Sequence, residues 1–128
     1  MLNKILVIDD DPEFVGGVSN LLQAKGYTVD TASNGTDGFN KAKQQSPDLI
    51  LLDVMMAQKS EGFDIARSLQ NEPTTKAIPV ILITGIRKEM NLPFGFEPDS
   101  EWLPVKTVLE KPVKPDILLA AVEKNIRK

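Results

Sequence analysis

Residues 49–52 read LILL, a run of four apolar residues that an aspartate follows at once. A run without a polar residue is typical of a strand whose two faces are both covered. Residues 5–8 (ILVI) and residues 80–83 (VILI) have the same character. The three runs therefore predict three central strands of one parallel sheet.

Two mixed runs predict the edges of this sheet. Residues 27–32 alternate apolar and polar side chains, and residues 105–109 also combine the two kinds, as strands with one face in water do. Between the five runs, apolar residues recur at the spacing of amphipathic helices. These helical stripes, which are apolar except for Lys25 and Asn125, are Phe14, Val18, Leu21, Leu22 and Lys25; Phe39 and Ala42; Phe63, Ala66 and Leu69; and Leu118, Ala121, Val122 and Asn125.

Helix ends and strand order complete the predicted fold. Gly26 is placed to end the first helix, the second ends before Pro47, and the last stripe is expected to reach Lys128. Strands that alternate with helices predict the α/β class, with a doubly wound, five-stranded parallel sheet in the flavodoxin-like order 2-1-3-4-5. No linker divides the chain, so residues 1–128 are expected to form a single domain without an output domain.

The composition excludes several function classes. The 128 residues include no cysteine and no histidine, which excludes disulfides, thiolate zinc sites, His-ligated metals and Ser-His-Asp chemistry. The formal net charge of −3 gives no indication of the basic surface that nucleic-acid binding usually requires. No apolar run approaches the roughly 20 residues of a membrane span. We therefore expect a cytoplasmic protein with neither nucleic-acid nor membrane partners.

Polar residues follow four of the predicted strands. They are Asp9 and Asp10, Asp53, Thr84 and Lys111. In the order 2-1-3-4-5 these four strands are neighbours, so their carboxyl ends bring the carboxylates, the hydroxyl and the ammonium together. Carboxylates held this close repel unless a cation intervenes, and a hard ion such as Mg²⁺ is the natural occupant. A phosphoryl group is the second expected guest, because an ammonium and a hydroxyl can bind its oxygens.

Five motifs make the chain resemble the receiver domain of bacterial two-component response regulators, of the single-domain chemotaxis type. They are residues 5–12 (ILVIDDDP), 48–56 (DLILLDVMM), 62–63 (GF), 83–85 (ITG) and 110–113 (EKPV). Together they span almost the whole chain. The resemblance implies a phospho-accepting signalling protein that passes the signal on by protein contact or serves as a phosphoryl relay or sink. It would catalyse only its own phosphorylation and dephosphorylation and would not be an enzyme with a separate substrate.

The resemblance also implies a role for each matching residue near the metal. Asp53 would take a phosphoryl group from the phosphohistidine of a sensor histidine kinase or a phosphotransfer protein. Asp10 and Asp53 would bind Mg²⁺ directly, Asp9 would act largely through water, and Met55 would contribute its backbone carbonyl. Asp11 is expected to lie in solvent or to cap the following helix rather than bind the metal.

Further roles follow for the residues around the phosphoryl group. Thr84 would bind one of its oxygens and shift on activation, and Lys111 would pair with it and with Asp53. The bond between Lys111 and Pro112 is the one that is cis in this family. Activation would change the conformation of the face formed by residues 84–111, for protein–protein output. The resemblance assigns neither the downstream protein nor the oligomeric state.

Three departures from the family pattern stand out. Val108 occupies the position of the usual aromatic switch residue, three residues before Lys111, so the usual coupling between threonine and an aromatic ring cannot operate. Residues 54–62 lack the usual proline and are one residue longer. The segment from Thr84 to Lys111 is several residues longer than usual.

The longer segment contains a proline-rich and aromatic stretch at residues 92–104. Its prolines disfavour a long crossover helix, so we expect a short helix near residues 86–91 and then an ordered loop. Three aromatic side chains either pack as a lid on the sheet or form an exposed docking or dimer surface. They are Phe94, Phe96 and Trp102.

Three other functions fit these residues less well than a receiver does. A degenerate receiver, acting as a phosphorylation-independent interaction module, would not need the full set of acidic, hydroxyl and ammonium groups. A flavodoxin-like nucleotide binder would end its first strand in a phosphate-binding loop, whereas this chain has three aspartates there. A carboxylate-nucleophile phosphatase would usually have a second acid where Met55 stands.

Overall fold

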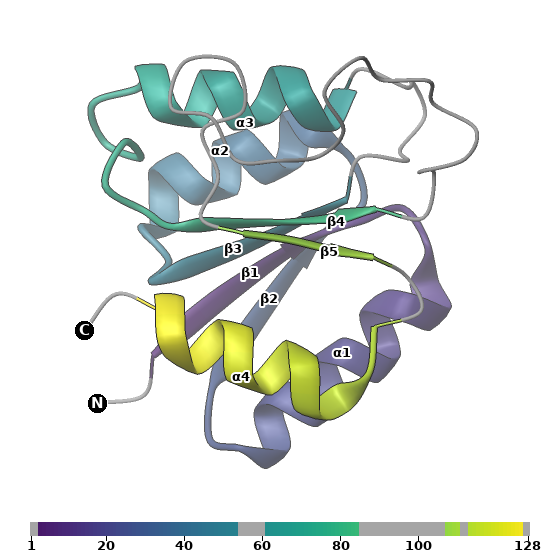
Figure 1. Ribbon diagram of the computed structural model, residues 1–128. Helices are drawn as coiled ribbons and strands as arrows, with labels where there is room; N and C mark the ends of the chain where they lie inside the picture. The colour runs from purple at the N-terminus through teal and green to yellow at the C-terminus, as the bar shows by residue number, and fades with distance from the viewer. Residues whose placement is uncertain (1–2, 54–60, 85–106, 111–112, 127–128) are drawn as a thin grey trace.

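The computed structural model describes residues 3–53, 61–84, 107–110 and 113–126. Strands and helices alternate along most of the chain, as the sequence predicts (Figure 1). In chain order the elements are β1 (Lys4–Ile8), α1 (Pro12–Ala24), β2 (Thr28–Ala32), α2 (Gly35–Gln45), β3 (Leu49–Asp53), α3 (Glu61–Asn71), β4 (Val80–Thr84), β5 (Thr107–Glu110) and α4 (Pro115–Asn125).

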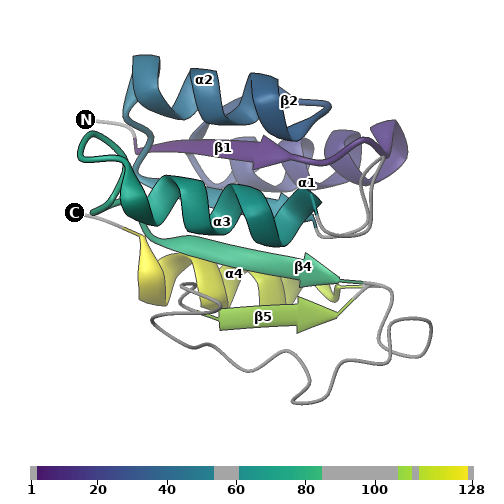
Figure 2. The ribbon, with the colours of Figure 1, turned by 90° about the horizontal axis from the view of Figure 1, so that it is seen from above.

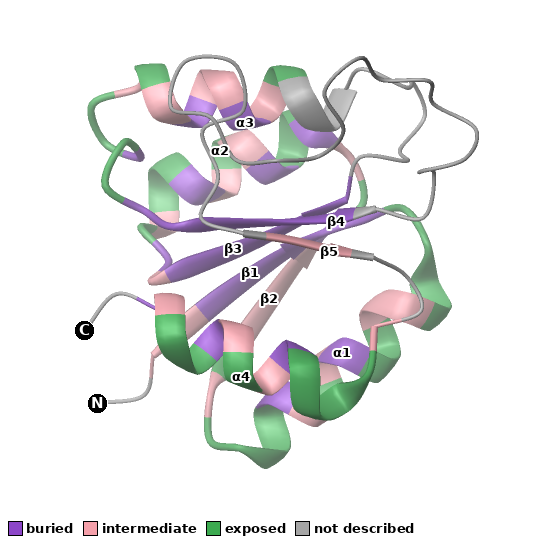
Figure 3. Cartoon of the chain, viewed as in Figure 1, coloured by how far each residue is buried: buried purple, intermediate pink, exposed green. Residues whose placement is uncertain are grey.

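The strands form one parallel sheet in the order β2-β1-β3-β4-β5, which confirms the predicted topology. The three runs without polar residues are the central strands β1, β3 and β4, and they are buried (Figure 3). The two mixed runs are the edges, as predicted. The edge strand β2 begins one residue later than expected, at Thr28, and β5 is described over Thr107–Glu110, one residue beyond its expected end at Leu109.

Helices cover both faces of the sheet: α2 and α3 lie on one face, and α1 and α4 lie on the other (Figures 1 and 2). Alternate residues of each central strand therefore enter two separate cores. The core under α2 and α3 contains Leu6, Ile8, Ala32, Ala42, Ile50, Leu52, Ala66, Leu69, Ile78, Val80 and Leu82. The core under α1 and α4 contains Ile5, Val7, Val18, Leu22, Leu49, Leu51, Ile81, Ile83, Leu118, Val122 and Ile126.

Most helix ends agree with the sequence signals. Gly26, after α1, has a φ of 94°, a backbone conformation that glycine adopts without strain. Helix α2 ends at Gln45, and the residue that follows, Ser46, is left-handed with a φ of 46°. The expected continuation of the last helix to Lys128 is wrong, because α4 ends at Asn125. Ile126 is extended (φ −63°, ψ 139°), and its side chain is buried in the core under α1 and α4.

Helix α2 approaches β1 very closely at Gly38. A Cβ atom at this position would lie 2.5, 2.7 and 2.9 Å from Cδ1, Cγ1 and Cγ2 of Ile8, which is fully buried. Only a residue without a side chain allows the helix to lie this near the end of β1. Gly38 is therefore required by packing rather than by backbone conformation.

Several predictions concern residues outside the described parts of the chain. They are the short helix near residues 86–91, the lid or docking role of the stretch at 92–104, and the length of the loop after Asp53, whose residues 54–60 are not described. Among the helices that the structure does describe, none combines the length and apolar character that crossing a membrane requires.

Candidate functional site

The carboxyl ends of β1 and β3 bring three aspartates together. Ile8 pairs with Leu52 across the two strands, so the next residues, Asp9 and Asp53, follow side by side. One carboxylate oxygen each from Asp9, Asp10 and Asp53 lies within 4.8 Å of the others. Asp9 is 3% exposed and Asp53 is 1% exposed, whereas Asp10 is exposed. The sequence prediction that these carboxylates meet agrees with this arrangement.

Local hydrogen bonds shape the loop that carries Asp9. Its backbone N–H donates to the carbonyl oxygen of Ala32 at 3.0 Å, which continues the pairing of β1 with β2 by one residue. Its carboxylate Oδ1 accepts the backbone N–H of Asp11 at 2.9 Å. Oδ1 of Asp11 in turn accepts the backbone N–H of Glu13 at 3.1 Å and caps α1. The expectation that Asp11 caps the helix is confirmed.

The donor set fits a hard divalent cation. It consists of carboxylate oxygens alone, and oxygen is the ligand that Mg²⁺ prefers. Two of the three carboxylates are almost fully buried, where neighbouring negative charges repel most strongly. Exposed Asp10 keeps one side of the cluster open to solvent. A cation with part of its water shell retained suits this combination of buried and open carboxylates.

The structure describes the other predicted site residues to different extents. Ile83 pairs with Asp53, so the backbone of Thr84 lies one residue further along the neighbouring strand. Val108 of β5 lies opposite Leu82 of β4 and packs, partly buried, against the core under α2 and α3. Met55, Lys111 and Pro112 lie outside the described residues. Their predicted roles, including the cis peptide bond, are therefore not tested by the structure.

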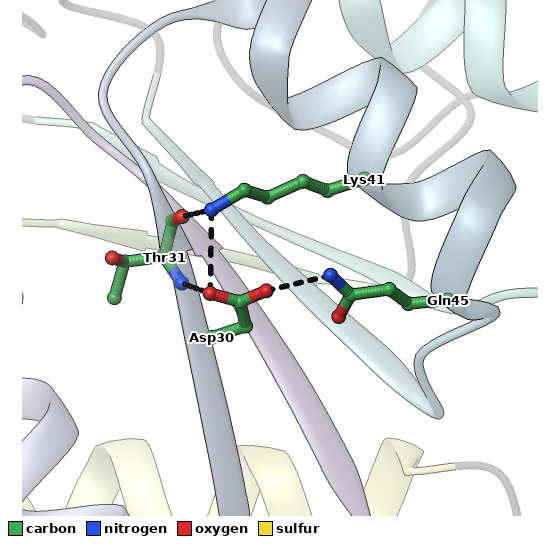
Figure 4. Close-up of polar contacts among 4 residues, drawn as sticks. All are labelled: Asp30, Thr31, Lys41 and Gln45. Atoms are coloured by element: carbon green, nitrogen blue, oxygen red, sulfur yellow. Dashed lines mark hydrogen bonds and ion pairs between the residues drawn. The ribbon is translucent and has the colours of Figure 1, made fainter.

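Sequence reasoning missed a polar cluster that joins α2 to the edge strand β2 (Figure 4). Asp30 accepts hydrogen bonds from the Gln45 side chain at 2.8 Å and the Thr31 backbone N–H at 2.8 Å. Lys41 Nζ contacts Asp30 Oδ1 at 3.3 Å and donates to the Thr31 carbonyl oxygen at 2.5 Å. Lys41 and Gln45 are four residues apart on one helix face, and this spacing was the available signal.

This cluster sets the ionisation of Asp30. Burial raises the pKa of Asp30, but the hydrogen bonds from Gln45, Thr31 and Lys41 and the charge of Lys41 outweigh it. The net result is a pKa below the ordinary value of 3.8. Asp30 therefore stabilises the contact between α2 and β2 in its ionised form.

Comparisons with known proteins agree on one family. The family profile described as "Response regulator receiver domain" matches residues 5–123. The chain is 33% identical over 119 residues to Protein PilH of Pseudomonas aeruginosa, covering 93% of both chains. It is 36% identical over 127 residues to the response regulator PleD of Caulobacter vibrioides, but it spans only 27% of that protein.

Solved structures show the same fold. Chemotaxis protein CheY4 of Vibrio cholerae superimposes with a TM-score of 0.80 at 25% identity, covering 98% of this chain and 100% of that chain. The receiver domain of sensor histidine kinase PA1611 from Pseudomonas aeruginosa gives a TM-score of 0.81 at 20% identity, covering 98% of each chain. That structure is described as having a magnesium ion coordinated in its active-site cleft. The chain belongs to the receiver domain family of two-component response regulators.

Proposed function

We propose that this chain is a phospho-accepting receiver of the single-domain chemotaxis type, in which Asp53 takes a phosphoryl group. The observation that carries the proposal is the buried acidic cluster of Asp9, Asp10 and Asp53 at the carboxyl ends of β1 and β3. A pure interaction module has no use for buried carboxylates that repel one another. A site that binds a cation and a phosphoryl group, in contrast, needs such carboxylates to hold the cation.

The reaction at Asp53 is an in-line transfer. A carboxylate oxygen of Asp53 forms a bond to phosphorus while the bond from phosphorus to the donor's imidazole nitrogen breaks, and the electron pair stays on that nitrogen. Lys111 neutralises charge on the phosphoryl oxygens, and Thr84 donates a hydrogen bond to one of them. The product is an acyl phosphate at the end of the central strand β3.

The carboxylates would hold Mg²⁺ in this reaction. Asp10 and Asp53 would be the direct ligands, Asp9 would act largely through water, and Met55 would contribute its backbone carbonyl. The ion, when bound, offsets negative charge on the phosphoryl oxygens. The oxygen-only donor set and the magnesium site of the PA1611 receiver support this assignment.

The partners follow from the family. The phosphoryl donor is a sensor histidine kinase or a phosphotransfer protein, and the output is a conformational shift of the face formed by residues 84–111. Val108 packs, partly buried, against the core under α2 and α3 at the position of the usual aromatic switch residue, so this shift would not use the usual coupling between threonine and an aromatic ring. The similarity to PilH over 93% of both chains supports a receiver of the single-domain type.

Binding of beryllofluoride, a mimic of an aspartyl phosphate, tests the site without a cognate kinase. The ¹⁹F NMR spectrum should show a bound signal for the wild type only when Mg²⁺ is present, and no bound signal for Asp53→Asn. Asp48→Asn is the matched control, because Asp48 precedes β3 at its other end and accepts the backbone N–H of Lys4. A wild type that binds no beryllofluoride in the presence of Mg²⁺ would favour the degenerate interaction module.

A further inference from the structure

Asp11 stands beside the acidic site but belongs to the helix that follows it. It is exposed, and its backbone is extended (φ −94°, ψ 104°). Its Oδ1 accepts the N–H of Glu13 at 3.1 Å, and its carbonyl oxygen accepts the N–H of Val15 at 3.0 Å. Two hydrogen bonds to the first turn of α1 therefore fix the position of Asp11.

A third hydrogen bond joins Asp11 to the site. Its backbone N–H donates to Oδ1 of Asp9 at 2.9 Å, and Asp9 is only 3% exposed. A backbone donor that is itself held by a helix restricts the rotation of the carboxylate that accepts it. Loss of a group that orients a metal ligand in this way typically lowers metal affinity or activity by about 10–100-fold.

We infer that Asp11 is a positioning residue for the cation site: by capping α1, its side chain holds the backbone N–H that orients the carboxylate of Asp9. The inference rests on the proposed function, in which Asp9 serves a bound Mg²⁺. It separates the three consecutive aspartates by role. Asp9 and Asp10 belong to the acidic cluster, whereas Asp11 acts through the helix.

The negative charge of Asp11 offers a competing explanation, since any acid near the site attracts a cation. The two explanations can be separated because capping requires a short side-chain acceptor, not a charge. Asn and Ser at position 11 keep the cap without the charge. Glu keeps the charge but is a poor cap, and Ala lacks both.

The experiment is a calorimetric Mg²⁺ titration of the wild type and the four variants Asp11→Asn, Asp11→Ser, Asp11→Glu and Asp11→Ala, with melting temperatures measured in a chelator. The affinities of Asp11→Asn and Asp11→Ser for Mg²⁺ should lie within about twofold of the wild-type affinity. Asp11→Ala and Asp11→Glu should bind Mg²⁺ about fivefold more weakly than the wild type. This loss is just below the roughly 10–100-fold range for removal of a group that orients a metal ligand. The loss is moderate because Pro12 still favours an extended residue before it.

Asn34→Ala is the matched control for helix stability. Asn34 caps α2 by accepting the N–H of Asp37 at 2.8 Å, and it takes no part in the acidic cluster. The Asn34→Ala variant should have a lower melting temperature, as Asp11→Ala should, and an unchanged affinity for Mg²⁺. Three results would overturn the inference but leave the proposed function standing. They are an Mg²⁺ affinity of Asp11→Ala equal to that of the wild type, an equal loss of Mg²⁺ affinity in Asp11→Asn and Asp11→Ala, and a loss of Mg²⁺ affinity in Asn34→Ala. A wild type that binds no Mg²⁺ would overturn the proposed cation site together with it.

Discussion

Replacing Gly38 by alanine tests the close packing of α2 on β1. The new Cβ would lie 2.5–2.9 Å from three side-chain atoms of Ile8, all well inside ordinary van der Waals contact. Ile8 is fully buried, so it cannot move into solvent. Overpacking of this kind costs about 1–3 kcal/mol, and three simultaneous contacts favour the upper end. Alanine regains about 1 kcal/mol of helix propensity, so we expect a net loss of about 2 kcal/mol.

The measurement is urea-induced unfolding followed by circular dichroism, with the free energy of unfolding compared at an unchanged m-value. Gly16→Ala and Gly17→Ala are matched controls, because a Cβ at either position in α1 meets nothing within 4 Å beyond the adjoining backbone of its own helix. Each control should gain about 0.5–1 kcal/mol from helix propensity alone.

A double-mutant cycle then assigns the loss to Ile8. In an Ile8→Ala background the three contacting atoms are gone, so Gly38→Ala should stabilise the protein as the α1 controls do. Gly38→Ala should cost about 2 kcal/mol in the wild type and gain about 1 kcal/mol in the Ile8→Ala background, so the coupling energy between the two positions should be about 3 kcal/mol. A Gly38→Ala protein as stable as the wild type, or additive effects in the cycle, would refute the reasoning.

Two further substitutions probe the polar contacts. Asp30→Asn should lower the free energy of unfolding at pH 7 by no more than about 1 kcal/mol, because the side chain is partly exposed. Since the folded-state pKa of Asp30 lies below 3.8, this stabilisation is present above pH 3.8 and is lost as the pH falls through the folded pKa; a difference that grows in acid would contradict this sign. Thr75→Val removes the buried hydrogen bond from Oγ1 to the Leu69 carbonyl oxygen at 2.7 Å and should cost about 1–2 kcal/mol in urea unfolding; an unchanged midpoint would show that this bond contributes nothing.

The strand order could be predicted because burial leaves a direct trace in the sequence. A central parallel strand has both faces covered, so β1, β3 and β4 each contain four consecutive apolar residues, while β2 mixes in Asp30 and threonines. The acidic cluster could be predicted for the same reason. Once β1 and β3 are neighbours, the residues that follow them must meet at one edge.

Features that depend on a specific contact could not be predicted. The requirement for Gly38 arises only when α2 is placed on β1 at one position, since the sequence shows simply a glycine within a helix. The end of α4 depends on the burial of Ile126, which favours an extended backbone over another helical turn. The Asp30 cluster likewise depends on how α2 lies against β2.

The most direct test of the central claim is the intact mass of the protein after incubation with Mg²⁺ and acetyl phosphate. The wild type and Asp48→Asn should each gain the mass of one phosphoryl group, the gain should require Mg²⁺, and Asp53→Asn should gain none. Phosphorylation of Asp53→Asn to the same extent as the wild type would contradict the assignment of Asp53 as the phospho-acceptor.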